Sequence, residues 1–167
     1  DMGSDDIFHK RRAKSERELR RGAARRAVYE KVLIVCEGSK TEPLYFGEIK
    51  DAFEISTANI RISGDCGSDP LSVVRHGEHL YAEEKRTSPS DPYDRVYFVF
   101  DKDSHATFQQ AMERIQAIKP RGVFYAVPSI PSFEYWLLLH YEYTTAPFIR
   151  TGNKSAGDMV IASLRRY

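Results

Sequence analysis

The sequence contains only two cysteines and one tryptophan in 167 residues, and it has no long apolar run. Two cysteines are too few for a disulfide framework, and Cys36 and Cys66 lack the spacing of metal ligands. No stretch approaches the roughly 20 apolar residues that span a bilayer, and the first residues are charged where a signal peptide is apolar. We therefore expect a soluble cytoplasmic protein that makes no membrane contact.

The amino-acid composition favours one globular domain. Hydrophobic residues make up 41% of the chain and aromatic residues 12%, which excludes an intrinsically disordered protein. A chain of this length buries roughly 70% of its unfolded surface, so it needs no disulfide or metal to fold. The net charge of +1 excludes a chain that is strongly basic or acidic throughout.

The positive charge is concentrated near the amino terminus. Residues 10–26 hold nine Lys and Arg side chains against two Glu side chains. This segment contains good helix formers and no proline, so it predicts a helix when ordered, yet it lacks a broad apolar stripe. It suits a phosphate backbone, and a solvated lead-in is the equally weighted alternative. The candidate nucleic-acid contacts are Arg11, Arg12, Arg17, Arg20, Arg21 and Arg25.

Deleting residues 1–26 is expected to weaken nucleic-acid binding and to flatten its salt dependence. The reason is that each phosphate contact made by Lys or Arg releases condensed counterions, and this release favours binding less as the salt concentration rises. The measurement compares the dissociation constants of the full chain and of the deletion variant for an oligonucleotide over a range of salt concentrations. An unchanged salt slope would assign the arm another role.

Strand and helix patterns alternate through the rest of the chain. Short apolar runs at residues 32–36, 96–100 and 123–127, with a weaker one at 59–63, predict four strands. Helical spacing over residues 43–53, from 70 onward and over 108–118 predicts the helices between them, with a buried side of the first formed by Leu44, Phe46, Ile49 and Phe53. Asp69 and Pro70 are typical of a helix start. The β-α-β-α-β-α-β order predicts an open parallel α/β sheet.

Three regions are expected along the chain. Residues 1–30 form the basic arm, residues 31–128 the α/β core, and residues 129–167 a helical extension. Within the extension, Ser132 is placed to cap a short apolar helix, and Ser155 with Asp158 predicts a capping box for a last helix.

Acidic residues follow two of the predicted strands. Glu37 and Gly38 come after the first strand, and Asp101 and Asp103 come after the third. Ligands of such sheets bind at the carboxyl ends of the strands, where the strand order reverses. Like charges about 4 Å apart repel by roughly 4 kcal/mol at an effective dielectric of 20, so the group requires a cation, and oxygen ligands suit Mg²⁺ or Mn²⁺. The alternative is a set of surface turn acids, with Asp101 capping the next helix.

Four further side chains are candidates near these acids. Glu134 lies in an apolar segment, where an ionised carboxylate needs a partner or a metal, so it is the candidate fourth acid. Lys40 and Lys102 flank the acids and suit a scissile phosphate, although each is equally typical of a solvated loop. His105 is placed to act as a general base or to orient a ligand, against a purely structural role at a helix start.

Three segments carry a resemblance to a known family. VLIVCEGSKTEPLYF, VYFVFDKDSHATF and PSFEYWLLLHYEY, in this order and spacing, resemble the RloB family of phage-defence proteins, whose core is similar to the Toprim domain of topoisomerases, primases and overcoming-lysogenization-defect nucleases. The resemblance implies a Toprim-like, Rossmann-like core with Glu37, Asp101 and Asp103 as its catalytic and metal-binding acids. Glu42 follows Gly38 by a longer step than in the nuclease members, and we do not include it among the ligands.

The resemblance also implies a function. It implies a metal-dependent nuclease that hydrolyses phosphodiester bonds of DNA or RNA, transfer RNA included, in bacterial defence against phage. A companion ATPase (RloA-like) is the implied partner, and self-association is left open. Relatives continue past a helix like the last one here, so truncation at Tyr167 also stays open.

Two other functions compete with the nuclease. A haloacid-dehalogenase-like phosphatase also carries DxD after a hydrophobic strand, but after its opening strand and not its third. A non-catalytic Toprim-like adaptor, binding nucleic acid or the ATPase, is the other alternative. The substrate, DNA or RNA, and the number of metals are left open.

Overall fold

The computed structural model of the chain describes residues 30–55, 60–64, 66–67, 69–102 and 106–167. The predicted arm, with its six candidate arginines, lies outside these residues. So do Asp103 and His105, and the roles predicted for all of them stay predictions.

Four parallel strands form one open sheet. They are β1 (Val32–Cys36), β2 (Ile60–Ser63), β3 (Arg95–Asp101) and β4 (Phe124–Ser129), and they lie side by side in the order β2-β1-β3-β4. All three strand pairs are parallel. The chain leaves β1 toward β2 and returns on the other side of β1 to form β3, so the strand order reverses between β1 and β3. The predicted α/β architecture is confirmed.

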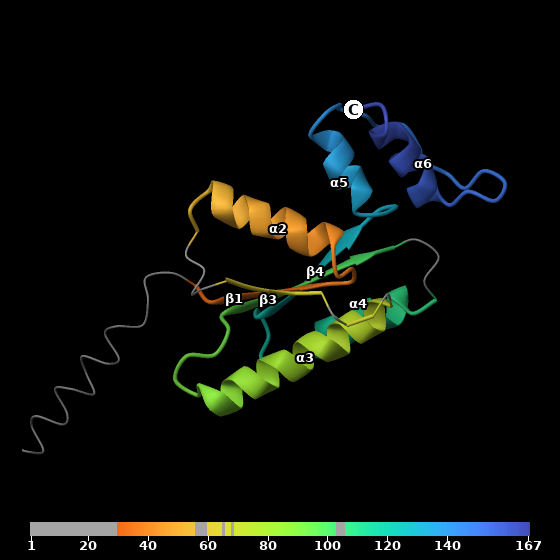
Figure 1. Cartoon of the computed structure of the whole chain (residues 1–167). Helices are drawn as coiled ribbons and strands as arrows, with labels where there is room; N and C mark the ends of the chain where they lie inside the picture. Colours follow the sequence, from red (N-terminus) through yellow and green to blue (C-terminus); the bar gives the residue numbers. More distant parts are fainter. Residues whose placement is uncertain (1–29, 56–59, 65, 68, 103–105) are drawn as a thin grey trace, which may run out of the picture.

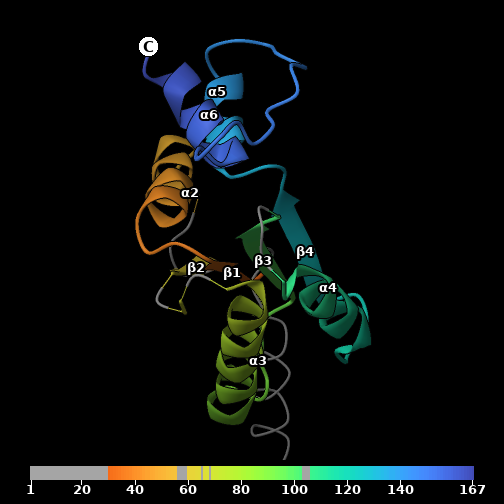
Figure 2. The ribbon, with the colours of Figure 1, turned by 90° about the vertical axis from the view of Figure 1, so that its right-hand side faces the viewer.

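Helices cover both faces of the sheet. α2 (Thr41–Ala52) lies on one face, α3 (Pro70–Thr87) and α4 (Phe108–Ala117) lie on the other, and the sheet runs between them (Figures 1 and 2). α5 (Glu134–Leu139) and α6 (Ala156–Leu164) follow β4 beyond its carboxyl end (Figure 1). None of the helices in the described ranges combines the length and apolarity that crossing a membrane requires.

Two helix starts form as the sequence predicts. The Asp69 carboxylate accepts a hydrogen bond from the Ser72 N–H at 3.1 Å, and Pro70 occupies the first turn of α3. Ser155 and Asp158 form a reciprocal capping box at α6, with distances of 2.8 and 3.1 Å. Caps of this kind satisfy backbone N–H groups that have no partner within the helix. Residues close together in the sequence were sufficient to predict where both helices begin.

The alternation of side chains along the strands builds two cores. Alternate residues of β1 and β3, among them Leu33, Phe98 and Phe100, are fully buried on the face covered by α3 and α4. The intervening residues Cys36 and Val99 are buried with Phe133 on the α2 face. Each such side chain contributes about 1.5–3 kcal/mol on full burial. Because Asp101 comes two residues after Val99, the pleat places it on the α2 face.

The first helix departs from the predicted pattern. Leu44 and Phe53 were expected on its buried side, but they are 64% and 75% exposed. Phe46, which was also expected there, does contact the core, and Tyr45 contacts it as well. The helix begins at Thr41, and the residues turned inward are spaced at i, i+3, i+4 from Glu42, which is itself buried. The prediction of buried Leu44 and Phe53 was wrong because it used the apolar residues alone to choose the helical face.

The last strand is also longer than predicted. β4 continues through Pro128 to Ser129, two residues beyond the end of the predicted strand. Proline is tolerated because β4 is an edge strand, so its missing N–H breaks no ladder hydrogen bond on the open side. The two extra residues pair Asp101 with Ser129 in register.

Candidate metal centre

Glu37 connects the ends of β1 and β3. Its backbone N–H continues the ladder by donating to the Val99 carbonyl at 3.0 Å. Its carboxylate Oε2 accepts a hydrogen bond from the backbone N–H of Asp101 at 2.9 Å. The acid that follows β1 therefore lies against the acid that ends β3, at the reversal of strand order where α/β proteins bind ligands.

Asp101 is a half-buried carboxylate in an acidic environment. It accepts a hydrogen bond from the Phe133 N–H, while its Oδ1 atom is buried and has no hydrogen-bond partner among the described residues. Burial, followed by repulsion from Glu37, Glu134 and Glu42, raises its pKa to about 8. At neutral pH this site favours either a proton or a cation on Asp101.

Glu42 joins this cluster from the first turn of α2. Its side chain is 7% exposed and accepts hydrogen bonds from its own backbone N–H and that of Gly38. Burial raises its pKa despite those bonds, and Glu134 and Glu37 add repulsion. Sequence reasoning left Glu42 out, although a helical phase that included Tyr45 and Phe46 would have turned it inward.

Glu134 enters from the other side of the cluster. It is the first residue of α5 and accepts a hydrogen bond from the Ser132 hydroxyl at 2.7 Å. It lies close enough to Asp101 and Glu42 to raise the pKa of both. Glu37, Glu134 and Glu42 thus all lie within electrostatic range of Asp101.

A buried hydroxyl that the sequence did not indicate lies beside Asp101. Ser129 is 2% exposed, and its Oγ atom has no hydrogen-bond partner among the described residues. Partners in a parallel register point to the same face, so Ser129 and Asp101 both face the α2 side. Two neighbouring buried oxygen atoms without partners indicate a place where a bound group completes the structure.

The donor set suits a divalent cation. Carboxylate oxygens are the preferred ligands of Mg²⁺ and Mn²⁺, and a cation offsets the repulsion that raises the pKa of Asp101. Within the ranges the structure describes, no group of three His, Cys, Asp or Glu side chains is arranged to hold a metal ion. The acids therefore repel one another without forming a preformed metal site. The type of ligand atom that they offer suits a divalent cation, but their present arrangement is not that of a coordination shell.

Three of the flanking residues predicted from sequence are described by the structure, namely Gly38, Lys40 and Lys102. Gly38 lies directly behind the Glu42 carboxylate. Lys40 precedes α2 and Lys102 follows β3, and both side chains are exposed, with no ion pair among the described residues. The Lys102 N–H donates to the Ser129 carbonyl at 2.9 Å, which extends the β3–β4 ladder past Asp101. Both lysines stand beside the acids as single positive charges.

Cys36 lies beneath the cluster and is not a nucleophile. It is fully buried at the end of β1, and burial, with repulsion from Glu42, raises the pKa of its thiol to about 12. A thiol that stays protonated at neutral pH neither attacks substrates nor binds metal readily.

Replacing Gly38 with Ala is expected to displace Glu42 and to lower the free energy of unfolding by about 1–2 kcal/mol, as overpacking does. An added Cβ would overlap the Glu42 carboxylate, which is buried and hydrogen-bonded to Gly38. The matched control is Gly47→Ala in α2, where nothing lies within 4 Å of the added atom. That variant should gain about 0.5–1 kcal/mol from helix propensity. Denaturant titrations compare them, and equal stability of Gly38→Ala and the parent would contradict the packing.

Comparison with known proteins identifies the family. The model of the family described as RloB-like protein matches residues 32–166, which is most of the chain and contains every described acid of the cluster. No curated protein and no solved structure matches the chain significantly. The chain belongs to the RloB-like family.

Proposed function

We propose that this protein is a metal-dependent nuclease that hydrolyses phosphodiester bonds of nucleic acid. The observation that carries the proposal is the convergence of four carboxylates, with a partnerless Asp101 oxygen, at the reversal of strand order. Acids that repel one another at a ligand-binding edge are costly unless they hold a cation. The resemblance of the same segments to Toprim-containing nucleases supports the proposal.

The proposed roles follow from the positions of the side chains. A bound Mg²⁺ or Mn²⁺ supplies charge stabilisation at the phosphate and lowers the pKa of water. Glu37 is held by the Asp101 N–H, so its carboxylate is oriented before any ligand arrives. Asp101 gives up its proton when the cation binds. Lys40 and Lys102 are the exposed cations placed to attract the negatively charged backbone.

The substrate and the cellular setting are part of the proposal. We propose DNA or RNA, transfer RNA included, as the substrate class. By resemblance, we propose a role in defence against phage with a companion ATPase. The cluster lies at the third strand in chain order, whereas haloacid-dehalogenase-like phosphatases carry their acidic pair after the opening strand. The position of Asp101 therefore favours the nuclease over the phosphatase.

The test incubates the full chain with labelled DNA, RNA and transfer RNA in Mg²⁺, in Mn²⁺ and in EDTA. Cleavage is expected only with metal, and Glu37→Gln should lose it. Glu48→Gln is the matched control because Glu48 is an exposed acid of α2, outside the cluster. Tight binding without cleavage in every metal would support an adaptor instead. Trapping of Asp101 by beryllium fluoride as an acyl-phosphate mimic would support a phosphatase.

A further inference from the structure

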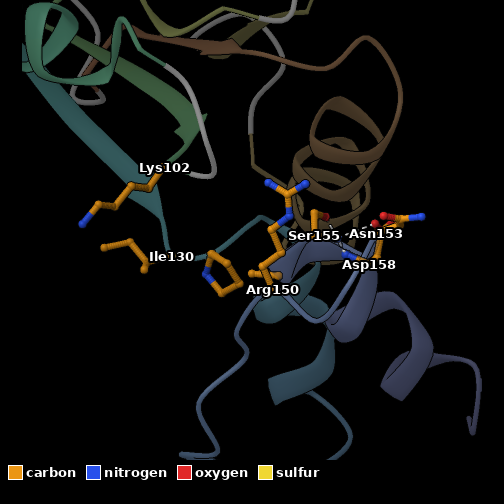
Figure 3. Close-up of a pocket in the computed structure, with 8 residues that line it drawn as sticks. Lys102, Ile130, Arg150, Asn153, Ser155 and Asp158 are labelled. Atoms are coloured by element: carbon orange, nitrogen blue, oxygen red, sulfur yellow. Dashed lines mark hydrogen bonds between the residues drawn. The ribbon is translucent and has the colours of Figure 1, made fainter.

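A cavity of about 460 Å³ opens beside the carboxylate cluster, between the end of the sheet and the carboxyl-terminal extension. Figure 3 shows Lys102 and Ile130 on the side of the sheet, and Arg150, Asn153, Ser155 and Asp158 on the side of the extension. This volume lies within the range of about 300–1,000 Å³ that is typical of small-molecule sites. The cavity is thus large enough for one nucleotide.

The cavity and the carboxylate cluster share two wall segments. Lys102 lines the cavity and directly follows Asp101. Pro131 also lines it and comes two residues before Phe133, whose N–H bonds the Asp101 carboxylate. The cavity approaches the acids through this second segment, because Lys102, one residue after Asp101, points to the opposite face of the sheet. The carboxyl-terminal extension contributes the opposite wall, which no part of the α/β core supplies.

The charge of the cavity is opposite to that of the cluster. Lys102 and Arg150 are exposed, and neither has an ion-pair partner within the described part of the chain. Asp158 is the only acid that the described residues contribute to the lining, and it accepts the Ser155 N–H at 2.8 Å as part of the α6 cap. Among the described lining residues, two cations thus accompany one carboxylate that is already engaged. The cavity attracts an anion, whereas the neighbouring cluster attracts a cation.

The lining also has an apolar part. Ile130 is 60% exposed, and with Pro131 and Ala156 it provides an uncharged surface between the two walls. A sugar or base covers such a surface, while a guanidinium binds phosphate oxygens in pairs. A nucleotide combines these two properties in one molecule. A free inorganic anion would leave the apolar surface uncovered.

We propose that this cavity binds one nucleotide of the substrate strand next to the cleaved bond, with its phosphate on Arg150. The inference rests on the proposed nuclease function and adds a binding subsite contributed by the carboxyl-terminal extension. It holds the strand in position relative to the acids. Its contribution to affinity requires no metal, because the contacts come from the protein's own cations.

The test measures binding of fluorescein-labelled DNA and RNA oligonucleotides to the full chain in EDTA. Arg150→Gln is expected to weaken binding of the preferred strand about tenfold and to reduce the salt slope by about one. Arg86→Gln is the matched control, since Arg86 is an exposed residue in the last turn of α3, outside the cavity lining, and it should change neither quantity. Arg150→Lys keeps the charge and should give intermediate affinity.

The outcomes separate this inference from the proposed function. If the parent chain fails to cleave in any metal but Arg150→Gln still weakens strand binding, the subsite stands and the nuclease proposal fails. If the parent chain cleaves and Arg150→Gln binds as tightly as the parent with the same thermal midpoint, the subsite is overturned. The subsite would also be overturned if adenosine monophosphate bound through Arg150 and the oligonucleotide did not displace it. That result would show that the cavity binds free nucleotides and not the substrate strand.

Discussion

Replacing Asp101 with Asn is expected to abolish metal-dependent cleavage and, at the same time, to make the metal-free protein more stable. The two effects have one cause. Asp101 is half-buried beside Glu37, Glu42 and Glu134, and its pKa is raised to about 8. Asn keeps the size of the side chain and can accept the Phe133 hydrogen bond, but it carries no charge to repel the other acids. Most substitutions lower the free energy of unfolding, so an increase would indicate that repulsion between Asp101 and the other acids destabilises the parent protein.

The size of the stability gain depends on pH, and its sign follows from linkage. Because the folded-state pKa of Asp101 lies above its ordinary value of 3.8, the folded state binds a proton that the unfolded state releases. The contribution to stability is fully present below about pH 4 and is lost as the pH rises to about 8. Allowing for solvent screening of a partly exposed group, we expect a loss of about 2 kcal/mol over this range. Asp101→Asn should lack this loss of stability, because Asn at position 101 does not titrate.

Denaturant titrations in EDTA across this pH range measure the effect. The two proteins should have similar stability at the acid end and diverge in favour of Asp101→Asn toward pH 8. Asp51→Asn is the control, because Asp51 is an exposed acid of α2 outside the cluster. A variant that is less stable than the parent at pH 8 and still cleaves would remove Asp101 from the proposed centre.

Lowering the pH from 8 to 6 is expected to weaken Mn²⁺ binding by about a hundredfold. A cation displaces the proton held by Asp101, so each pH unit below the pKa costs about tenfold in apparent affinity. The raised pKa of Glu42 acts in the same direction. Solvent-exposed carboxylates with ordinary pKa values would show almost no change over this interval.

Titration calorimetry in two buffers of different ionisation enthalpy measures both the affinity and the protons released. Below pH 8 the parent chain should release close to one proton for each bound ion. Asp101→Asn should bind more weakly and release fewer protons. Binding that is equally tight at pH 6 and pH 8, with no proton release, would show that Mn²⁺ occupies a site other than this cluster.

Local sequence determined the elements of this fold and part of the candidate centre. The apolar runs of β1 and β3 predicted buried strands, and the caps of α3 and α6 were predicted from residues within one helical turn. Glu37 and Asp101 were found because acids at the ends of adjacent parallel strands meet at one edge. These inferences succeed because strand periodicity and capping depend on neighbours in the chain.

Only the tertiary structure decided which face of α2 turns inward and what the carboxyl-terminal extension contributes. Glu42 is buried because Tyr45 and Phe46 pack on the sheet, a choice that the position of Leu44 alone would have reversed. Arg150 lines the same cavity as Lys102, although it lies almost fifty residues further along the chain. The physical reason is that helix rotation and long-range docking depend on the packing of surfaces distant in sequence, which no local pattern encodes.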